Sequence, residues 1–440
     1  MKKIAIIIAI LLILPSWVRG DSEENILKIT IERIRKVYVG DEVPTFSIVI
    51  NVDGQRWEGK YEGQDIIIRE KIEFKIKEDK DKINISIEIF EEGKRGYITP
   101  DDGILNIELD TKRGDWNKDD FLGDIDAYGH AGGCSDGKID EYDYEIWFDI
   151  IYNDYDNDRL TYWEEENIYH TNPYVSDYGI DYDGDGVAIE WEDKYGYDPF
   201  NIENHANIDT DNDGLSNLEE YMMSEWLSDP FRRDIYIEVD CMEEYNGIKH
   251  IMPEKSIQLL YSAFSKKNIM LFIDNGIIEE MDIIPYKETL NFDELNEIYQ
   301  KYFLHNDPSN PRKGVFHYAI ICHEIEFWRR PAGGMNFKRD AFVLGSYYIQ
   351  KWRPTESKQI IAHASLFMHE LGHQLGLNNY IGIDNEHTRF PWQLQYWLFR
   401  NYKSCMNYRY SFSLVDYSDG THGFLDYDDW GNINLSRFSS

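Results

Sequence analysis

Residues 115–230 carry the feature that most constrains how this chain can fold, a concentration of negative charge that a compact structure has to neutralise. The segment holds 33 Asp and Glu against 4 Lys and Arg, so it accounts for −29 of the net charge of −37 in the 440-residue chain. Tyrosine, tryptophan and isoleucine are interleaved with the acidic residues, which is not the composition of a disordered acidic tail. Carboxylates packed this densely repel one another unless cations neutralise them, so the segment favours divalent metal ions as ligands. Nucleic acid is not expected as a partner, because it requires the opposite charge.

One segment of this block, DTDNDGLSNLEE at 209–220, has oxygen-bearing side chains at the spacing of an EF-hand loop. Gly214 stands at the sixth position, where such a loop turns sharply. Calcium takes six to eight oxygen ligands, and this spacing folds them round one point. The predicted ligands are the side chains of Asp209, Asp211, Asp213, Asn217 and Glu220 and the carbonyl of Leu215.

Two earlier segments, 154–165 and 181–192, repeat the pattern. The three starts are 27 and 28 residues apart, which indicates an internal repeat. Ile189 occupies the ninth position of 181–192, so water would serve there, and Arg159 replaces the turn glycine of 154–165. The predicted ligands are Asp154, Asp156, Asp158 and Glu165 in 154–165, and Asp181, Asp183, Asp185, Glu192 and the carbonyl of Val187 in 181–192.

A fourth, irregular copy is predicted over 124–143, where an insertion separates the first two carboxylates from the rest. Its candidate residues are Asp124, Asp126, Asp136, Gly137, Asp140 and Asp143. The whole array is similar to the EF-hand and thrombospondin type 3 calcium-binding repeats of surface proteins. That resemblance implies structural calcium, which would stiffen a spacer between the segments on either side.

The N-terminal twenty residues, MKKIAIIIAILLILPSWVRG, have the form of a secretory signal. Lys2 and Lys3 precede an apolar run over residues 4–14, and permitted residues precede a cut at Asp21. An apolar run this short does not predict a membrane span, and an uncleaved anchor is the alternative. We therefore expect a secreted or cell-surface protein, with a membrane as partner only if the segment stays uncleaved.

An exported chain permits disulfides, and four cysteines allow three pairings. The sequence does not choose among Cys134, Cys241, Cys322 and Cys405.

Residues 21–114 alternate between apolar and polar side chains with period two. The segments ILKITIERI, FSIVINVDG, IIIREKIEFKIK, INISIEIF and ILNIELD predict five strands separated by turns. The pattern predicts a small antiparallel β-sandwich, with a weak resemblance to a C2 domain. Docking of a substrate is one role for it, and a simple N-terminal cap is another.

Residues 231–440 alternate strands and helices, which predicts an α/β domain. Strands are expected in RRDIYIEVD, NIMLFID and VFHYAIICHEI, and a helix in PEKSIQLLYSAFSKK. A long helix is then expected over TESKQIIAHASLFMHELGHQLGL, ending near Gly376. The chain is thus expected to be multidomain, with a signal peptide at 1–20, a sandwich at 21–114, calcium-binding helices and loops at 115–230 and an α/β domain at 231–440.

The long helix contains HELGH, in which His369 and His373 are four residues apart. Side chains at this spacing lie on one helix face, so both histidines can bind one metal ion. Glu370 lies beside them, where a carboxylate can take a proton from metal-activated water. The motif predicts a zinc site with Glu370 as general base.

Two motifs together make the C-terminal domain resemble the metzincin metallopeptidases. The first is HExxHxxG, matched by HELGHQLG with Gly376 at its end, and the second is a methionine turn, matched by SCMNY around Met406. The resemblance covers roughly residues 232–425. It implies a zincin fold, a zinc cofactor, peptide-bond hydrolysis, and Tyr408 as a residue that swings to the metal or the oxyanion.

The sequence departs from the metzincin pattern at the third metal ligand. The family places His, or occasionally Asp, where this chain has Asn379, and a neutral amide oxygen is a poor zinc ligand. Glu386 follows too soon to come from a later helix, as the glutamate ligand of the sister zincin class does. We favour Asp384, while His387, Asn379 itself, His422 and the aspartates from 416 to 429 stay open, as does a site with no third protein ligand.

The sequence therefore predicts an exported, calcium-stabilised zinc endopeptidase with a polypeptide substrate. The competing interpretation is a calcium-dependent surface or adhesion protein whose protease domain is no longer catalytic. The intact His-Glu-His set favours the enzyme, and Asn379 favours the surface protein. A metallo-amidase acting on cell-wall peptide would share the same metal chemistry.

Overall fold

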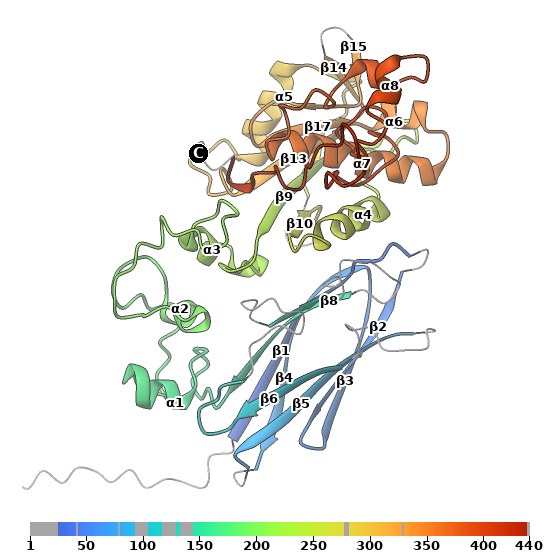
Figure 1. Ribbon diagram of the computed structural model, residues 1–440. Coiled ribbons are helices and arrows are strands. Elements are labelled where there is room, and N and C mark those ends of the chain that lie inside the picture. The colour runs from blue at the N-terminus through green and yellow to red at the C-terminus, as the bar shows by residue number, and fades with distance from the viewer. Residues whose placement is uncertain are drawn as a thin grey trace, which may run out of the picture.

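The computed structural model describes residues 25–40, 43–77, 80–92, 104–116, 129–132, 144–276, 281–327 and 330–437. Figure 1 shows a β-sandwich, a segment of loops and short helices beside it, and an α/β domain above both. The expected signal peptide, Cys134 and the ligands of the irregular copy at 124–143 lie outside the described residues. Among the described residues, no helix is both long and apolar enough to cross a lipid bilayer.

Two four-stranded antiparallel sheets form the sandwich, and one apolar core lies between them. Their strand orders are β4-β1-β8-β7 and β3-β2-β5-β6. Alternation explains the packing, because Ile72 and Ile83 point inward while their charged neighbours Glu73 and Lys82 face water. The strands are β1 (Asn25–Lys36), β2 (Thr45–Val52), β3 (Gln55–Glu62), β4 (Asp65–Ile76), β5 (Lys82–Glu91), β6 (Ile104–Asp110), β7 (His130–Gly132) and β8 (Tyr144–Tyr152).

The sandwich continues past the boundary expected at residue 114. Strand β8 pairs with β1 from Leu27↔Tyr152 to Lys36↔Tyr144, so a strand of the acidic block completes the first sheet. Its two carboxylates are neutralised locally, Glu145 by Arg35 and Asp149 by Arg159. The high charge of the block concealed this strand, whose apolar residues alternate like those of the first five.

Residues 153–230 form three loops, each followed by a short helix. The helical elements are α1 (Tyr162–Glu164), η1 (Glu165–Tyr169), α2 (Ile189–Tyr195), α3 (Asn217–Met222) and η2 (Ser224–Trp226). Thr161 caps α1 and Ser216 caps α3, each in a capping box with a glutamate three residues on. The capping residue stands at the eighth position of its loop, so each loop leads directly into a helix.

The C-terminal domain is built on a sheet of order β10-β9-β13-β17-β16, with β11 also on β9. Its main strands are parallel, and only the edge strand β16 runs antiparallel. The strands are β9 (Asp234–Met242), β10 (Met270–Asp274), β11 (Ile283–Ile284), β13 (Phe316–Cys322), β16 (Gly334–Asn336) and β17 (Ala341–Gly345). A smaller sheet contains β12 (Thr289–Leu290), β14 (Glu324–Phe327) and β15 (Arg330–Ala332).

Helices cover both faces of the main sheet. On one face α4 (Glu254–Ser265) and α7 (Glu356–Gln374) pack against Ile237, Ile321 and Leu344, and on the other lie α5 (Phe292–Ile298) and η3 (Tyr299–Phe303). The remaining helices are α6 (Ser346–Trp352), η4 (Glu386–Thr388), α8 (Leu394–Leu398) and η5 (Leu435–Arg437). Packing of α7 on the sheet places its last turns beside the edge strand β16.

The sandwich and the α/β domain meet through buried polar contacts. Arg35 donates to the carbonyl of Leu271 at 2.7 Å and lies 4.1 Å above the ring of Tyr261. The hydroxyl of Ser262 donates to the carbonyl of Val37 at 2.5 Å. Because Tyr261 and Ser262 belong to α4, which packs on α7, the sandwich supports the helix that carries the candidate site.

Cys241, Cys322 and Cys405 are buried free thiols. The pairing of Cys322 with Cys405 that the sequence left open is therefore not formed.

Candidate metal sites

Helix α7 positions both histidines of HELGH and ends just after them. Its last turns are buried, and Gly372 allows close contact beneath, since a Cβ there would lie 2.6 Å from the sulfur of Met406. Gly376 has a φ of +99°, a left-handed conformation that glycine adopts without strain. The amide of Leu377 then donates to the carbonyl of Gly372 at 2.9 Å and closes the helix end.

The hydrogen bonds of the two imidazoles determine which nitrogens face the cleft. His369 Nδ1 lies 2.8 Å from the carbonyl oxygen of Cys405, and His373 Nδ1 lies 3.0 Å from that of Leu377. A carbonyl only accepts hydrogen bonds, so each Nδ1 carries a proton and each Nε2 is the nitrogen placed to bind a metal.

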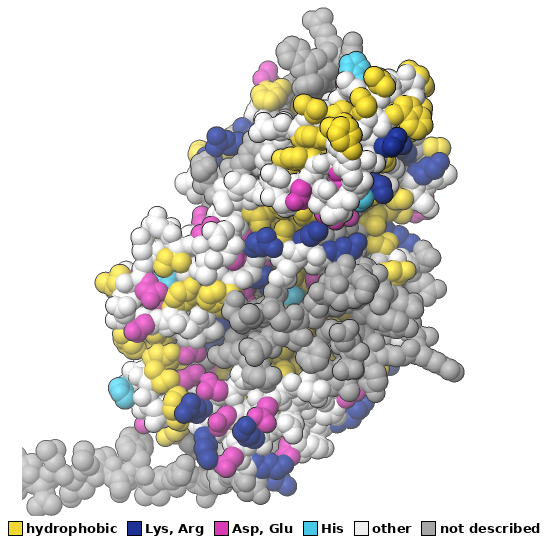
Figure 2. Space-filling model, viewed as in Figure 1, with side chains coloured by type: hydrophobic (Ala, Val, Ile, Leu, Met, Phe, Trp, Pro, Cys, Tyr) yellow, Lys and Arg dark blue, Asp and Glu magenta, His cyan; other side chains and the backbone are white. Residues whose placement is uncertain are grey.

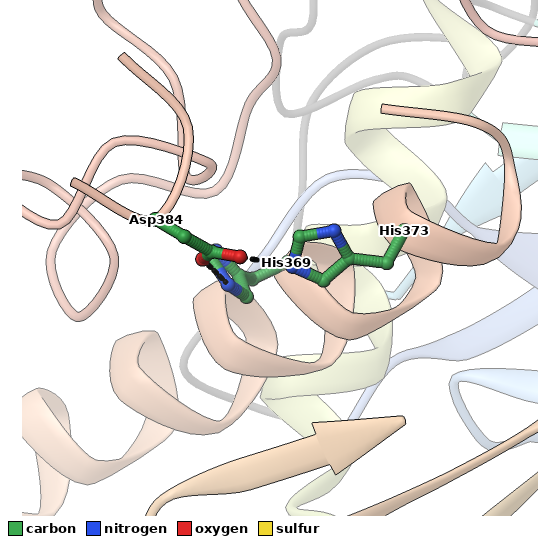
Figure 3. A group of neighbouring side chains, drawn as sticks. All are labelled: His369, His373 and Asp384. Carbon is green, nitrogen blue, oxygen red and sulfur yellow. Dashed lines mark ion pairs between the residues drawn. The ribbon is translucent and has the colours of Figure 1, made fainter. Parts of the chain in front are cut away.

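Asp384 lies between the two Nε2 atoms. Its Oδ1 is 3.0 Å from Nε2 of His369, and its Oδ2 is 3.1 Å from Nε2 of His373. Figure 3 shows the carboxylate pointing at both rings, which come from successive turns of one helix. Although burial would raise the pKa of Asp384, hydrogen bonds and charge from the two histidines lower it well below its usual value.

The geometry of these three residues fits a metal ion. Their donor atoms lie within 4.8 Å of one another, and tetrahedral zinc with ligands near 2 Å requires separations of about 3.3 Å. Burial disfavours the imidazolium of His373, yet Asp384 raises the pKa of His373 to about 9. A bound cation would take the place of that proton. The side chain of Asp384 is 43% exposed, so the fourth position opens to the cleft.

Glu370 lies next to this group and is held by the edge strand. The amide nitrogen of Asn336, on β16, donates to its Oε2 at 2.8 Å and to its backbone carbonyl at 2.9 Å. Gly334 leaves room for the carboxylate, because a Cβ there would lie 2.5 Å from Oε1. Burial raises the pKa of Glu370, and the nearby His369 and His373 offset part of that rise. A carboxyl with a raised pKa suits proton transfer near neutral pH.

Met406 and Tyr408 lie in the turn that passes by the histidines. Met406 is fully buried, and its carbonyl accepts the backbone N–H of Asp384 at 3.2 Å. The ring of Tyr408 lies 5.8 Å from that of His369 and beneath the guanidinium of Arg389. Burial and the neighbouring carboxylate of Asp384 raise the pKa of Tyr408, so its hydroxyl keeps its proton and is able to donate.

The other third-ligand candidates do not join the two histidines. Asn379 and His387 are exposed, and neither lines the cleft of about 980 Å³ that contains His369 and His373. His422 instead bonds to Asp426, with its Nδ1 2.9 Å from Oδ2.

Sequence reasoning missed two asparagines that support the site. Asn378 bonds to His373 through its Oδ1, 2.9 Å from Nδ1, and through its Nδ2, 3.0 Å from the backbone carbonyl. Asn336 lies 34 residues from Glu370 in the chain. Nothing in the local pattern marks either residue, since only the fold brings Asn336 to Glu370.

The three predicted calcium loops share one backbone conformation. The fourth and sixth positions have positive φ in each, at Asn157 and Arg159, Gly184 and Gly186, and Asn212 and Gly214. In each loop the ninth residue also donates its N–H to the carbonyl of the residue before the first ligand, at 2.8–3.0 Å. Arg159 keeps the left-handed turn despite its side chain, which forms an ion pair with Asp149 at 2.8 Å.

Buried oxygens without hydrogen-bond partners point into these loops. In 209–220, Asn217 and Glu220 are each 1% exposed. Such atoms are costly to bury unless a cation or water satisfies them. Among the described residues, the loop oxygens without a partner include Asp156 Oδ1 and Oδ2, Glu165 Oε2, Asp183 Oδ2, Glu192 Oε1 and Oε2, Asp209 Oδ1, Asp211 Oδ2, Asn217 Oδ1 and Glu220 Oε1.

The repeat extends beyond the predicted ligands. In each loop the fifth-position aspartate accepts a backbone N–H from a residue 18 to 21 positions later, at 2.8–3.0 Å. The pairs are Asp158 with Asp177, Asp185 with Glu203, and Asp213 with Asp234. Of these later residues, Asp177 also places a carboxylate oxygen with those of Asp158 and Glu165.

His205 connects two of the loops. Its Nδ1 lies 3.1 Å from the amide nitrogen of Asn217, and its Nε2 lies 3.4 Å from Asp185 Oδ2 and 3.8 Å from Glu192 Oε1. An amide nitrogen only donates, so Nδ1 accepts and Nε2 carries the proton. The ring thus links 181–192 to the ninth position of 209–220.

Comparison with known proteins gives little further guidance. No family model matches the chain, and no curated protein matches it. A solved structure of extended synaptotagmin 2, comprising its SMP domain and two C2 domains, aligns over 31% of this chain and 30% of its own, with 11% identity and a TM-score of 0.18. A likeness at that score carries no argument about fold or function.

Proposed function

We propose that this chain is an exported, calcium-stabilised, zinc-dependent endopeptidase. The observation that carries the proposal is the convergence of His369, His373 and Asp384 beside the buried carboxylate of Glu370. The two imidazole nitrogens and one carboxylate are a donor set that suits zinc, with one position open to the cleft. A zinc ion held there supplies Lewis-acid chemistry, which polarises a carbonyl and acidifies water.

The residues around the site have separate roles in this proposal. Glu370 takes a proton from the attacking water and later passes it to the leaving amine. Tyr408, which keeps its proton, donates a hydrogen bond to the developing oxyanion. Asn336 positions Glu370 through two hydrogen bonds.

A polypeptide substrate is supported by the position of β16. This strand ends the order of the main sheet and lines the cleft with Gly334, Met335 and Asn336. An extended peptide can add to such an edge through main-chain hydrogen bonds.

The three loops supply the calcium part of the proposal. They hold the segment between the sandwich and the α/β domain in one conformation through buried carboxylates. Without cations these carboxylates would repel one another.

Replacing Asp384 with alanine tests the metal site directly. We expect this variant of residues 21–440 to bind zinc about 100-fold more weakly and to lose cleavage of a dye-labelled, unfolded protein, because one of three ligands is gone. Zinc content is measured by mass spectrometry after dialysis, and cleavage by release of dye.

Asn379→Ala is the matched control, since Asn379 occupies the family position but is exposed and lies off the cleft. It should keep both zinc and activity. Loss of zinc in the Asn379 variant, with zinc retained in the Asp384 variant, would reverse the assignment. A wild-type protein that holds zinc and cleaves nothing would instead favour the non-catalytic surface protein.

A further inference from the structure

Five large apolar side chains are exposed within nine residues at the far end of the α/β domain. We call them the aromatic face: Phe390, Trp392, Leu394, Trp397 and Leu398. Trp392 is 79% exposed and Leu394 74%. At about 150–250 Å² for each aromatic side chain, the three rings alone present on the order of 300 Å² to solvent. Figure 2 shows apolar side chains gathered on this end of the molecule, around α8.

The fold holds these side chains outward by specific contacts. Phe390 and Trp392 stack with ring centroids 4.6 Å apart and planes within 5°. The indole N–H of Trp397 donates to the carbonyl of Pro391 at 2.8 Å. The amide of Phe390 donates to Gln393 at 2.8 Å. A segment braced in this way presents its rings as an ordered surface, and apolar patches of a few hundred Å² are often functional.

The charge around the aromatic face is the opposite of that of the whole chain. The chain has 82 acidic residues in 440, yet residues 387–415 contain none. Arg389, Arg400 and Lys403 are exposed in this stretch. Arg389 pairs with the exposed Glu386 just before this stretch, so Arg400 and Lys403 supply the net positive charge beside the aromatic face.

We propose that the aromatic face docks on an anionic lipid surface. Tryptophan and phenylalanine rings are favoured at the boundary between headgroups and acyl chains, and bordering Arg and Lys bind lipid phosphates. A side chain as exposed as Trp392 projects from its surroundings, which suits insertion into lipid. The run of residues 387–415 without Asp or Glu matters because the net charge of −37 would otherwise oppose approach to an anionic membrane.

Docking in this way would orient the cleft toward the membrane. Arg389 borders the aromatic face, lines the cleft and lies 4.8 Å above the ring of Tyr408. Polypeptides that emerge from the same membrane would then reach the cleft first. The docking itself does not depend on catalysis, so it stands or falls separately from the proposed function.

Sedimentation with vesicles tests the proposal. Residues 21–440, which include every described residue and lack the apolar N-terminal run, are mixed with vesicles of 30% phosphatidylglycerol and 70% phosphatidylcholine at fixed calcium. We expect binding that weakens at least tenfold in Trp392→Ser/Trp397→Ser, and about fivefold for each of Arg400→Gln and Lys403→Gln. Vesicles of phosphatidylcholine alone should bind more weakly.

The matched control is Val175→Ser/Ile202→Ser, which removes two apolar side chains that are 59% and 71% exposed on the loop segment. It should bind vesicles as the wild type does. Equal binding by the tryptophan variant, with an unchanged melting temperature, would overturn the proposal. So would a wild-type protein that ignores vesicles but self-associates through the same tryptophans, since the aromatic face would then be a contact between copies.

Discussion

Replacing Glu370 with glutamine should lower kcat/KM for an unfolded protein substrate by about 10³-fold while zinc stays bound. Glutamine has the same shape and can still accept the hydrogen bond from Asn336, but an amide cannot take a proton from water. The metal ligands are untouched, because Glu370 contributes none of the three donors. Cleavage rates and zinc content, measured on the same preparation, separate loss of the base from loss of the metal.

Glu386→Gln is the control for this experiment. Glu386 lines the same cleft, but its side chain is 66% exposed and pairs with Arg389 on the surface. Removal of its charge should change the rate by less than about threefold, since an exposed carboxylate is largely screened. Full activity in Glu370→Gln would contradict the assigned mechanism. A similar loss in both variants would show that the cleft responds to charge rather than to a general base.

The two histidines of the candidate metal site could be anticipated because their spacing along a helix dictates their geometry. Residues four apart lie on one helix face, so the positions of His369 and His373 followed from the sequence. Asp384 was favoured because few donors lie close behind the helix, and the structure brings it to both histidines. The backbone N–H of Asp384 also donates to the carbonyl of Met406, which lies in a turn 22 residues later. No local sequence pattern predicts this contact.

The residues that support the site could not be anticipated, since distant strands supply them. Asn336 and Gly334 reach Glu370 only because β16 is the edge of a sheet whose five other strands are spread over residues 234–345. Likewise His205 lies outside every loop pattern, although it joins two loops. The positions of such residues depend on tertiary packing, so the periodicity of the sequence does not reveal them.

The boundary of the sandwich illustrates a conflict between two signals. The alternation in YEIWFDIIY predicts a strand, but the surrounding charge led us to group it with the acidic block. Strand β8 belongs to the sandwich because Arg35 and Arg159 neutralise its carboxylates. Those partners lie on β1 and in the first loop, so pairing across the fold decided the boundary.

Removing calcium should lower the melting temperature by about 10 °C or more at pH 8. A ligand at 100 times its dissociation constant stabilises by about 2.7 kcal/mol per site, and three sites together give about 8 kcal/mol. The melting curve is followed by calorimetry before and after treatment with EDTA. Because EDTA also removes zinc, each ion is added back alone. Calcium should restore the transition of the loop segment, and zinc should not.

The fall in melting temperature on removal of calcium should become smaller as the pH falls. In the metal-free protein, burial and neighbouring carboxylates raise the pKa of Glu165, Glu192 and Asp211 to about 8. Unfolded carboxyls titrate near 4, so the folded chain binds more protons between about pH 4 and 8. Stability of the metal-free protein is therefore present at low pH and lost as the pH rises through 8. Calcium takes the place of those protons, so its effect should be largest at high pH.

Variants of two adjacent glutamates distinguish calcium binding from a general effect of charge. Glu165 is buried in 154–165 and Glu166 beside it is exposed. Glu165→Gln should bind one calcium ion fewer than the wild type, while Glu166→Gln should bind as many as the wild type. Loop 154–165 is the strictest test of calcium binding, because Arg159 replaces the glycine at its turn. Isothermal titration calorimetry counts the bound ions. An equal count in the wild type and in Glu165→Gln would contradict calcium binding by this loop and would mean that its carboxylates stay protonated.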